Sequence, residues 1–238
     1  MSNACDDSCR LPDHAEDYIF FFTRQGYGSV MSFGPISARR QPDQYKQAID
    51  SILEATAQVL KQVGTQETTI DRIAEQAGES VGSIHYYFPN KIAIYEALMR
   101  RHFERIAVVA YSLSQRCAQA SADEFPELIA DILLATDRQD ILLSSLLRKI
   151  AAIHPSVGAV EIEHAKMLEM AVGTLIQDKL AAPGFRSNID PELSGAILTR
   201  ALMGLVRRTL TVDPPMLASD QFAAEFQQLI RGYLLARK

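Results

Sequence analysis

The stretch that most constrains the fold of this chain is TTIDRIAEQAGESVGSIHYYFPNK, residues 68–91. Apolar residues recur at helical spacing on both sides of Gly78, which predicts two short helices. Thr69 suits the N-cap of the first helix, and Gly78 permits a left-handed turn that a β-carbon disfavours. Ser80 suits the N-cap of the second helix, which Pro89 ends. Together these signals predict a helix-turn-helix.

Helical spacing also dominates the rest of the chain. An apolar face over residues 44–63 predicts a first helix that Gly64 ends. Further helices are expected at residues 91–113, 124–135, 140–153, 156–180, 191–211 and 222–234. The sequence shows no strand alternation of any length. We therefore expect an all-α fold, with an N-terminal three-helix helix-turn-helix domain followed by a larger helical domain.

Composition places the chain among ordinary folded proteins. Of its 238 residues, 47% are hydrophobic and 22% are charged. The longest apolar runs are too short to cross a bilayer, no signal peptide is visible, and three cysteines do not suggest a disulfide framework. These features predict a cytoplasmic protein without a membrane partner.

Charge neither names nor excludes a nucleic-acid partner. The net charge of −5 argues against wrapping DNA over the whole surface. The least acidic part of the chain, residues 39–105, carries nine basic and nine acidic side chains. The DNA-binding interpretation therefore depends on the helix-turn-helix and not on a basic patch.

The spacing of the motif resembles that of the TetR (tetracycline-repressor-like) transcriptional regulators. The matching residues are Gly64, Thr68, Thr69, Ile73, Ala74, Ala77, Gly78, Ser80, Gly82, Tyr87, Phe88 and Lys91. The resemblance covers about residues 43–103 and implies a DNA-binding domain there. It implies a helical effector-binding and dimerisation domain over residues 106–238. Residues 1–42, rich in glycine and proline, are interpreted as a flexible tail.

The resemblance and the geometry of the motif assign roles to single residues. We expect Val81, Gly82, Ser83 and His85 to read base edges in the major groove. Glu79 replaces the valine that is usual in the family, and His85 replaces the usual tyrosine, which puts the operator sequence in question but not the fold.

Other residues are expected to contact the DNA backbone or the domain core. Phosphate contacts are expected from Thr69, Tyr87 and Lys91, and these would set the register of the complex. For Arg39 and Arg40, just before the first helix, a basic arm in the adjacent minor groove and plain solvated charges are alternatives. Tyr86, Phe88 or both are expected in the small core of the domain.

The resemblance implies a repressor that binds a palindromic operator in double-stranded DNA as a homodimer. It also implies an unidentified small-molecule effector, no cofactor, no metal and no enzymatic activity. The alternatives are a helical metal-binding enzyme and a scaffold protein with a vestigial helix-turn-helix. Glu161 and His164 have the i, i+3 spacing of di-iron bundles, but no second Glu-x-x-His occurs. A solvated helix face is the preferred interpretation of this pair.

In the C-terminal half, we expect a dimer contact and either an effector pocket or a closed core. Dimer contacts are expected from small and apolar residues in two helices: Gly195, Ala196, Ile197, Leu198, Ala201, Leu202, Gly204, Leu205, and the stripe Phe222, Phe226, Leu229, Ile230, Tyr233, Leu234. Apolar and soft side chains that line either an effector pocket or a closed core are Leu128, Ile132, Leu142, Leu146, Leu147, Ile150, Met167, Met170 and Leu175. Arg148, His154 and His164 are candidate polar anchors in such a pocket, although a surface position is preferred for each.

Overall fold

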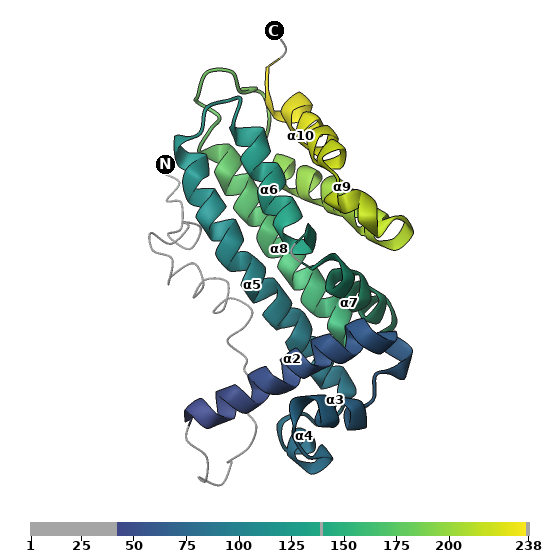
Figure 1. Ribbon diagram of the computed structural model, residues 1–238. Coiled ribbons are helices and arrows are strands. Elements are labelled where there is room, and N and C mark those ends of the chain that lie inside the picture. The colour runs from purple at the N-terminus through teal and green to yellow at the C-terminus, as the bar shows by residue number, and fades with distance from the viewer. Residues whose placement is uncertain (1–41, 139, 237–238) are drawn as a thin grey trace.

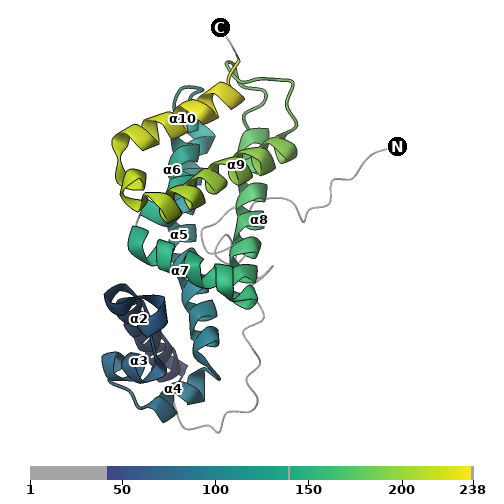
Figure 2. The ribbon, with the colours of Figure 1, turned by 90° about the vertical axis from the view of Figure 1, so that its right-hand side faces the viewer.

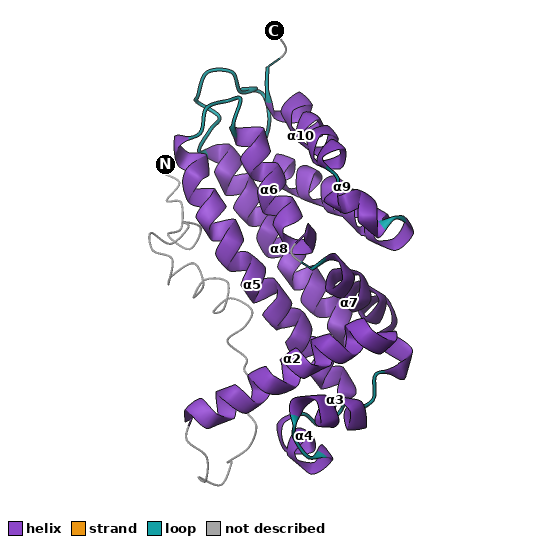
Figure 3. Ribbon diagram, in the orientation of Figure 1, coloured by secondary structure: helices purple, strands orange, loops and turns teal. Residues whose placement is uncertain are grey.

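The structure is a computed structural model that describes residues 42–138 and 140–236. Within these ranges every regular element is a helix, and the single β-type contact is an isolated bridge between Phe185 and Leu235 (Figure 3). The elements are α2 (Pro42–Glu67), α3 (Ile70–Ala77), α4 (Val81–Tyr87), α5 (Lys91–Gln119), α6 (Phe125–Arg138), α7 (Ile141–Ile153), α8 (Pro155–Gln177), α9 (Pro191–Val212), η2 (Pro214–Ala218) and α10 (Asp220–Leu234). The predicted all-α fold is confirmed.

Helix α5 connects the two ends of the molecule. It starts beside the compact group α2–α4 and runs alongside α6 and α8 to the opposite end (Figure 1). Helices α9 and α10 cross this layer on one side, where α9 packs on α8 and α10 packs on α6 (Figure 2). Because α5 is unbroken through residues 103–106, the expected domain boundary lies inside a continuous helix.

Two buried apolar clusters hold these helices together. The first joins α2–α4 to the first half of α5, to α7 and to the start of α8, and it contains Leu60 and Ile84 together with Leu147. The second lies among α6, α8, α9 and α10. Since fully burying one such side chain contributes about 1.5–3 kcal/mol, the packing of α7 on α2 couples the helix-turn-helix firmly to the rest of the chain.

Two glycines have different roles in the helical fold: Gly64 interrupts a helix, and Gly195 allows two helices to pack closely. At Gly64 the backbone leaves the helix with φ 77° and ψ −178°, so α2 is interrupted there, as predicted. Gly195 on α9 lies against Gly173 on α8, and an added β-carbon at Gly195 would come within 2.5 Å of the Gly173 nitrogen. Gly195 therefore serves packing within the chain and not the predicted dimer contact.

Several sequence interpretations fall outside the described residues. These are the flexible tail apart from Pro42, and the basic arm at residues 39–40. Across residues 42–138 and 140–236, the helices are too short or too polar to span a membrane.

Candidate nucleic-acid interface

The turn between α3 and α4 is built from local hydrogen bonds. Thr69 caps α3, its hydroxyl oxygen accepting the Arg72 backbone N–H at 3.3 Å. Gly78 follows the helix with φ 68° and ψ 27°, and the Glu79 N–H donates to the Ala74 carbonyl at 3.0 Å. This is the bonding pattern of a glycine C-cap, which satisfies carbonyls at the helix end. The predicted helix-turn-helix is present.

Helix α4 presents one face to the core and one face outward. Ser80 caps the helix by accepting the Ser83 N–H at 2.9 Å. Ile84 is fully buried, whereas Val81 is 37% exposed and His85 is also exposed. Ser83 is half-buried at the edge of the outward face. The predicted base readers therefore lie along the outward side of α4.

The fold of the chain does not require a glycine at position 82. Gly82 lies on the outward face, its φ is not positive, and an added β-carbon would find its nearest neighbour, the Ser80 hydroxyl, at 3.8 Å. A side chain would therefore fit the folded chain. Because glycine has no side chain, the backbone of α4 at this position is open to close approach by another molecule.

The position of Tyr87 does not fit its predicted phosphate contact. The residue is only 2% exposed, and its ring lies 5.2 Å from that of Tyr45 and 5.1 Å from that of Tyr86. A buried ring stabilises the domain core and cannot lie along a DNA backbone. Tyr86 is 52% exposed instead, and Phe88 occupies the core as expected.

The Lys91 side chain makes contacts within its own chain. Its ammonium donates to the Thr68 carbonyl at 2.7 Å and lies 5.8 Å from the centroid of the Tyr95 ring. The first contact fixes the backbone just before Thr69, an exposed residue at the N-terminus of α3. A helix N-terminus favours negative charge. An ammonium has three N–H donors, so this bond leaves Lys91 able to contact a phosphate as well.

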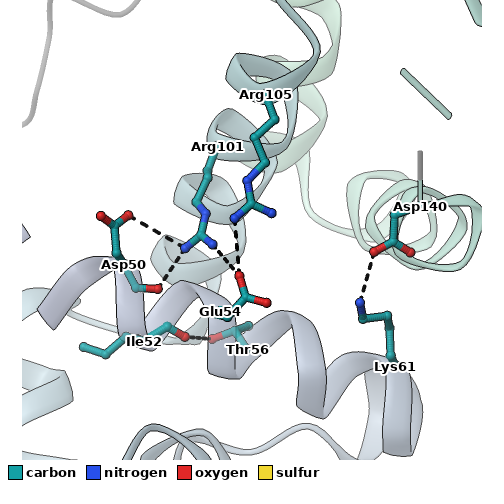
Figure 4. A network of polar contacts seen from close by, with 8 residues as sticks. All are labelled: Asp50, Ile52, Glu54, Thr56, Lys61, Arg101, Arg105 and Asp140. Carbon is teal, nitrogen blue, oxygen red and sulfur yellow. Dashed lines mark hydrogen bonds and ion pairs between the residues drawn. The ribbon is translucent and has the colours of Figure 1, made fainter. Parts of the chain in front are cut away.

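Ion pairs orient α2 on the rest of the chain (Figure 4). Arg101 of α5 donates to the Glu54 carboxylate at 2.5 Å and to the Asp50 carbonyl at 2.8 Å, and Arg105 reaches Glu54 at 3.3 Å. Partial burial alone would raise the pKa of Glu54, but the bonds and charges of Arg105 and Arg101 hold that pKa below its ordinary value. A second ion pair joins Lys61 to Asp140 at 3.0 Å. Sequence reasoning missed these contacts because the partners lie 47 to 79 residues apart.

The interpretation of Glu161 and His164 as a solvated helix face is wrong. His164 is 7% exposed, and the Glu161 carboxylate is enclosed between Arg148 of α7 and Arg207 of α9. Two arginines neutralise this carboxylate, so it is not a free ligand. Among residues 42–138 and 140–236, no cluster of three His, Cys, Asp or Glu side chains could hold a metal ion.

Comparisons with known proteins agree with this geometry. Residues 52–98 match the family model "Bacterial regulatory proteins, tetR family". The repressor AcnR of Corynebacterium diphtheriae is 26% identical over 180 residues, which cover 75% of this chain and 85% of AcnR.

Solved structures extend the likeness beyond the motif. A TetR transcription regulator from Haloarcula marismortui superposes with a TM-score of 0.64 at 20% identity, covering 80% of this chain and 100% of that one. A transcriptional regulator from Saccharomonospora viridis, solved in complex with choline, gives 0.63 at 19% identity and covers 81% and 100%. The helix-turn-helix, the family match over it and the shared fold agree: residues 52–98 carry the helix-turn-helix of the TetR family, and the chain has the fold of solved TetR-type regulators.

Proposed function

We propose that this chain is a transcriptional repressor whose residues 43–103 bind operator DNA by inserting α4 into the major groove. The observation that carries the proposal is the outward face of α4. There Val81, Gly82 and His85 are exposed while Ile84 and Tyr87 anchor the opposite face. A helix held out from the body in this way fits the major groove, where side chains distinguish all four base pairs.

The repressor is proposed to act as a homodimer on a palindromic operator. On α9, exposed residues recur on one side, and α10 adds Leu229 at 55% exposure. The exposed apolar and small residues of this α9 face are Leu193, Ile197, Ala201, Gly204, Leu205 and Val212, and the exposed polar residues Arg208 and Thr211 lie among them. Two copies that pair these faces form an intersubunit bundle and place one α4 each on half-sites about 34 Å apart.

Several residues predicted to form the dimer contact face the core of their own subunit instead. Leu198 and Leu202 are buried in the chain's own core, as are Phe226, Ile230 and Leu234. The proposed face is consequently narrower than the sequence pattern indicates, because each helix must also pack on its own subunit.

A small-molecule effector is proposed to bind within residues 106–238, with its polar group near a buried cluster on α5, α7 and α8. The His102 ring nitrogen lies 3.1 Å from the Ser144 hydroxyl, and the neighbouring His164 is buried with its Nε2 lacking a hydrogen-bond partner. A buried polar atom of this kind costs about 1–3 kcal/mol, which a ligand hydroxyl or carbonyl would recover by bonding to it.

The remainder of the effector is proposed to be apolar. Of the predicted lining residues, Leu146, Leu147 and Ile150 are buried in the same apolar cluster as Phe103. The other buried ones include Leu128, Ile132 and Leu175, which lie in the second cluster. Leu142 is 51% exposed and Met170 52% exposed, so these two line no buried site. The Saccharomonospora viridis neighbour holds choline, a small organic molecule, within the same fold. That likeness supports the size class of the ligand and not its identity.

The test is the selection of genomic DNA fragments by the purified full-length chain, followed by binding measurements on the selected fragments. The proposal expects specific binding that a Ser83→Ala or His85→Ala change redirects to other sequences. A chain that binds every fragment equally, or none, would reject the repressor in favour of a helical scaffold.

A further inference from the structure

Besides its apolar packing on α5 and α7, helix α2 makes polar contacts with the rest of the chain at two separate points. The first point is Glu54, which receives Arg101 and Arg105 of α5, while Arg101 also bonds the Asp50 carbonyl. The Arg101 side chain is only 14% exposed. Several charge-assisted bonds from a largely buried arginine make this attachment a fixed pivot.

The second point, Lys61 with Asp140, is weaker. A single bond of 3.0 Å joins two side chains that are 34% and 32% exposed. Pairs with this degree of exposure change an equilibrium by about fivefold at most. An interaction of this strength can open and close without unfolding the protein.

Asp140 has a second role that connects this bond to the buried cluster. One carboxylate oxygen accepts Lys61, and the other caps α7 by accepting the Leu143 N–H at 3.0 Å. The following turns of the same helix carry Ser144, which contacts His102, and Arg148, which pairs with Glu161. Residues 140, 144 and 148 lie four apart and share one face of α7.

We propose that the Lys61–Asp140 pair is a latch that transmits displacement of α7 to the helix-turn-helix. With the latch closed, α2 is held at both points and α4 has its DNA-binding orientation. When α7 shifts, Asp140 withdraws from Lys61, and α2 turns about the pivot at Glu54. The inference relies on the proposed function only in taking α4 as the DNA-binding element.

The geometry amplifies a small movement. Lys61 lies seven residues beyond Glu54, a lever of about 10 Å at 1.5 Å per residue. Each ångström of movement at the latch therefore turns α2 by about 5° on this lever. Packed helices shift by about 1–2 Å in such transitions, which is enough to misalign a recognition helix with its half-site.

The test measures the orientation of the helix-turn-helix directly, without DNA or effector. Spin labels at Glu75→Cys on α3 and Gln115→Cys on α5, both exposed, report the distance within one chain. Cys5 and Cys9 are changed to serine. Cys117 stays, since it is buried and desolvation raises the pKa of its thiol to about 11. Labelled full-length chain is diluted with unlabelled chain so that only distances within one chain contribute.

The variants isolate the latch from helix capping. Lys61→Met keeps the length of the side chain, and Asp140→Asn keeps the capping acceptor but removes the charge. Asp190→Asn is the matched control, because Asp190 caps α9 at 2.7 Å without joining α2. Arg231→Met removes an ion pair of 2.6 Å to Asp123 that does not involve α2.

The latch predicts a broadened or shifted label distance in Lys61→Met and in Asp140→Asn, with no further change in the double variant. Both changes should weaken binding to a selected operator fragment by about fivefold, the low end of ordinary allosteric coupling. An unchanged distance in both single variants, or an equal change in the two controls, would overturn the latch. If the parent chain binds no fragment, the proposed function fails while the distance measurement still decides the latch.

Discussion

The imidazole of His164 on α8 stacks on the ring of Phe103 on α5, with ring centroids 3.9 Å apart and planes inclined by 7°. The stack is enclosed, since His164 is 7% exposed and Phe103 is 3% exposed. It brings together the first half of α5 and the middle of α8. A titratable ring is thereby placed in the core of the chain.

Protein stability should depend on pH through His164. Burial, followed by the charges of Arg148 and His102, lowers the pKa of His164 from 6.5 to about 3. The folded chain keeps the ring neutral while the unfolded chain binds a proton below pH 6.5. Stability is therefore fully present above pH 6.5 and is lost as the pH falls toward 3. The loss is about 1.4 kcal/mol per pH unit, or about 2 kcal/mol at pH 5.

Urea unfolding at pH 7.5 and pH 5 measures this effect. His164→Phe, which keeps an aromatic ring against Phe103, should remove most of the difference. An equal pH dependence in parent and variant would show that other groups carry it.

Gly82→Ala should separate stability from DNA binding. Alanine fits the open space at this position and is a better helix former, so the free energy of unfolding should rise by about 0.5–1 kcal/mol. The added methyl group would lie on the face of α4 that is proposed to bind DNA, so it should weaken operator binding by tenfold or more. Thermal melting and gel shifts on the same preparation check both effects, and unchanged affinity would show that DNA does not approach this backbone.

The adjacent tyrosines Tyr86 and Tyr87 should behave in opposite ways. Tyr87→Ala removes a buried ring, so it should destabilise the chain by about 3–5 kcal/mol. Tyr86→Ala removes an exposed ring and should leave stability within about 0.5 kcal/mol while weakening DNA binding. Denaturant titration of the two variants distinguishes them. Similar destabilisation by both would mean that Tyr86 is also part of the core.

A charge on the exposed face of α9 should prevent dimerisation. Ile197 is 43% exposed there, and Ile197→Asp would place a carboxylate in the proposed intersubunit bundle. Val108→Asp on α5, at 54% exposure, is the matched control. Sedimentation at micromolar concentration should show a monomer for the first variant only. A monomeric parent chain would reject the dimer itself.

Local signals made the helix-turn-helix predictable from the sequence. Thr69, Gly78 and Ser80 define the start of α3, the end of α3 and the start of α4 through bonds between residues at most five positions apart, so their roles can be predicted from the sequence. The same stretch did not show that Tyr87, expected to contact phosphate, is 2% exposed whereas Tyr86 is 52% exposed. Which of the two tyrosines faces the core depends on the rotation of α4 about its axis, because successive residues of a helix point about 100° apart.

Features that depend on distant partners could not be predicted in this way. Gly195 was assigned to the dimer because nothing in the sequence shows that Gly173 lies against it. The Lys61–Asp140 pair spans 79 positions, and charged residues at such separations carry no pairing signal. His164 was placed at the surface because single histidines usually lie there, and its burial follows from the packing of α5 on α8.

The central claim is that the outward face of α4 reads DNA sequence. Selection from a random DNA pool by the full-length chain and by its His85→Ala variant tests this most directly. The account predicts that the parent enriches an inverted repeat with half-sites about one helical turn apart. It also predicts that the variant changes the preferred base at one symmetric pair of positions. No enriched repeat with the parent, or the same bases preferred by both chains, would contradict it.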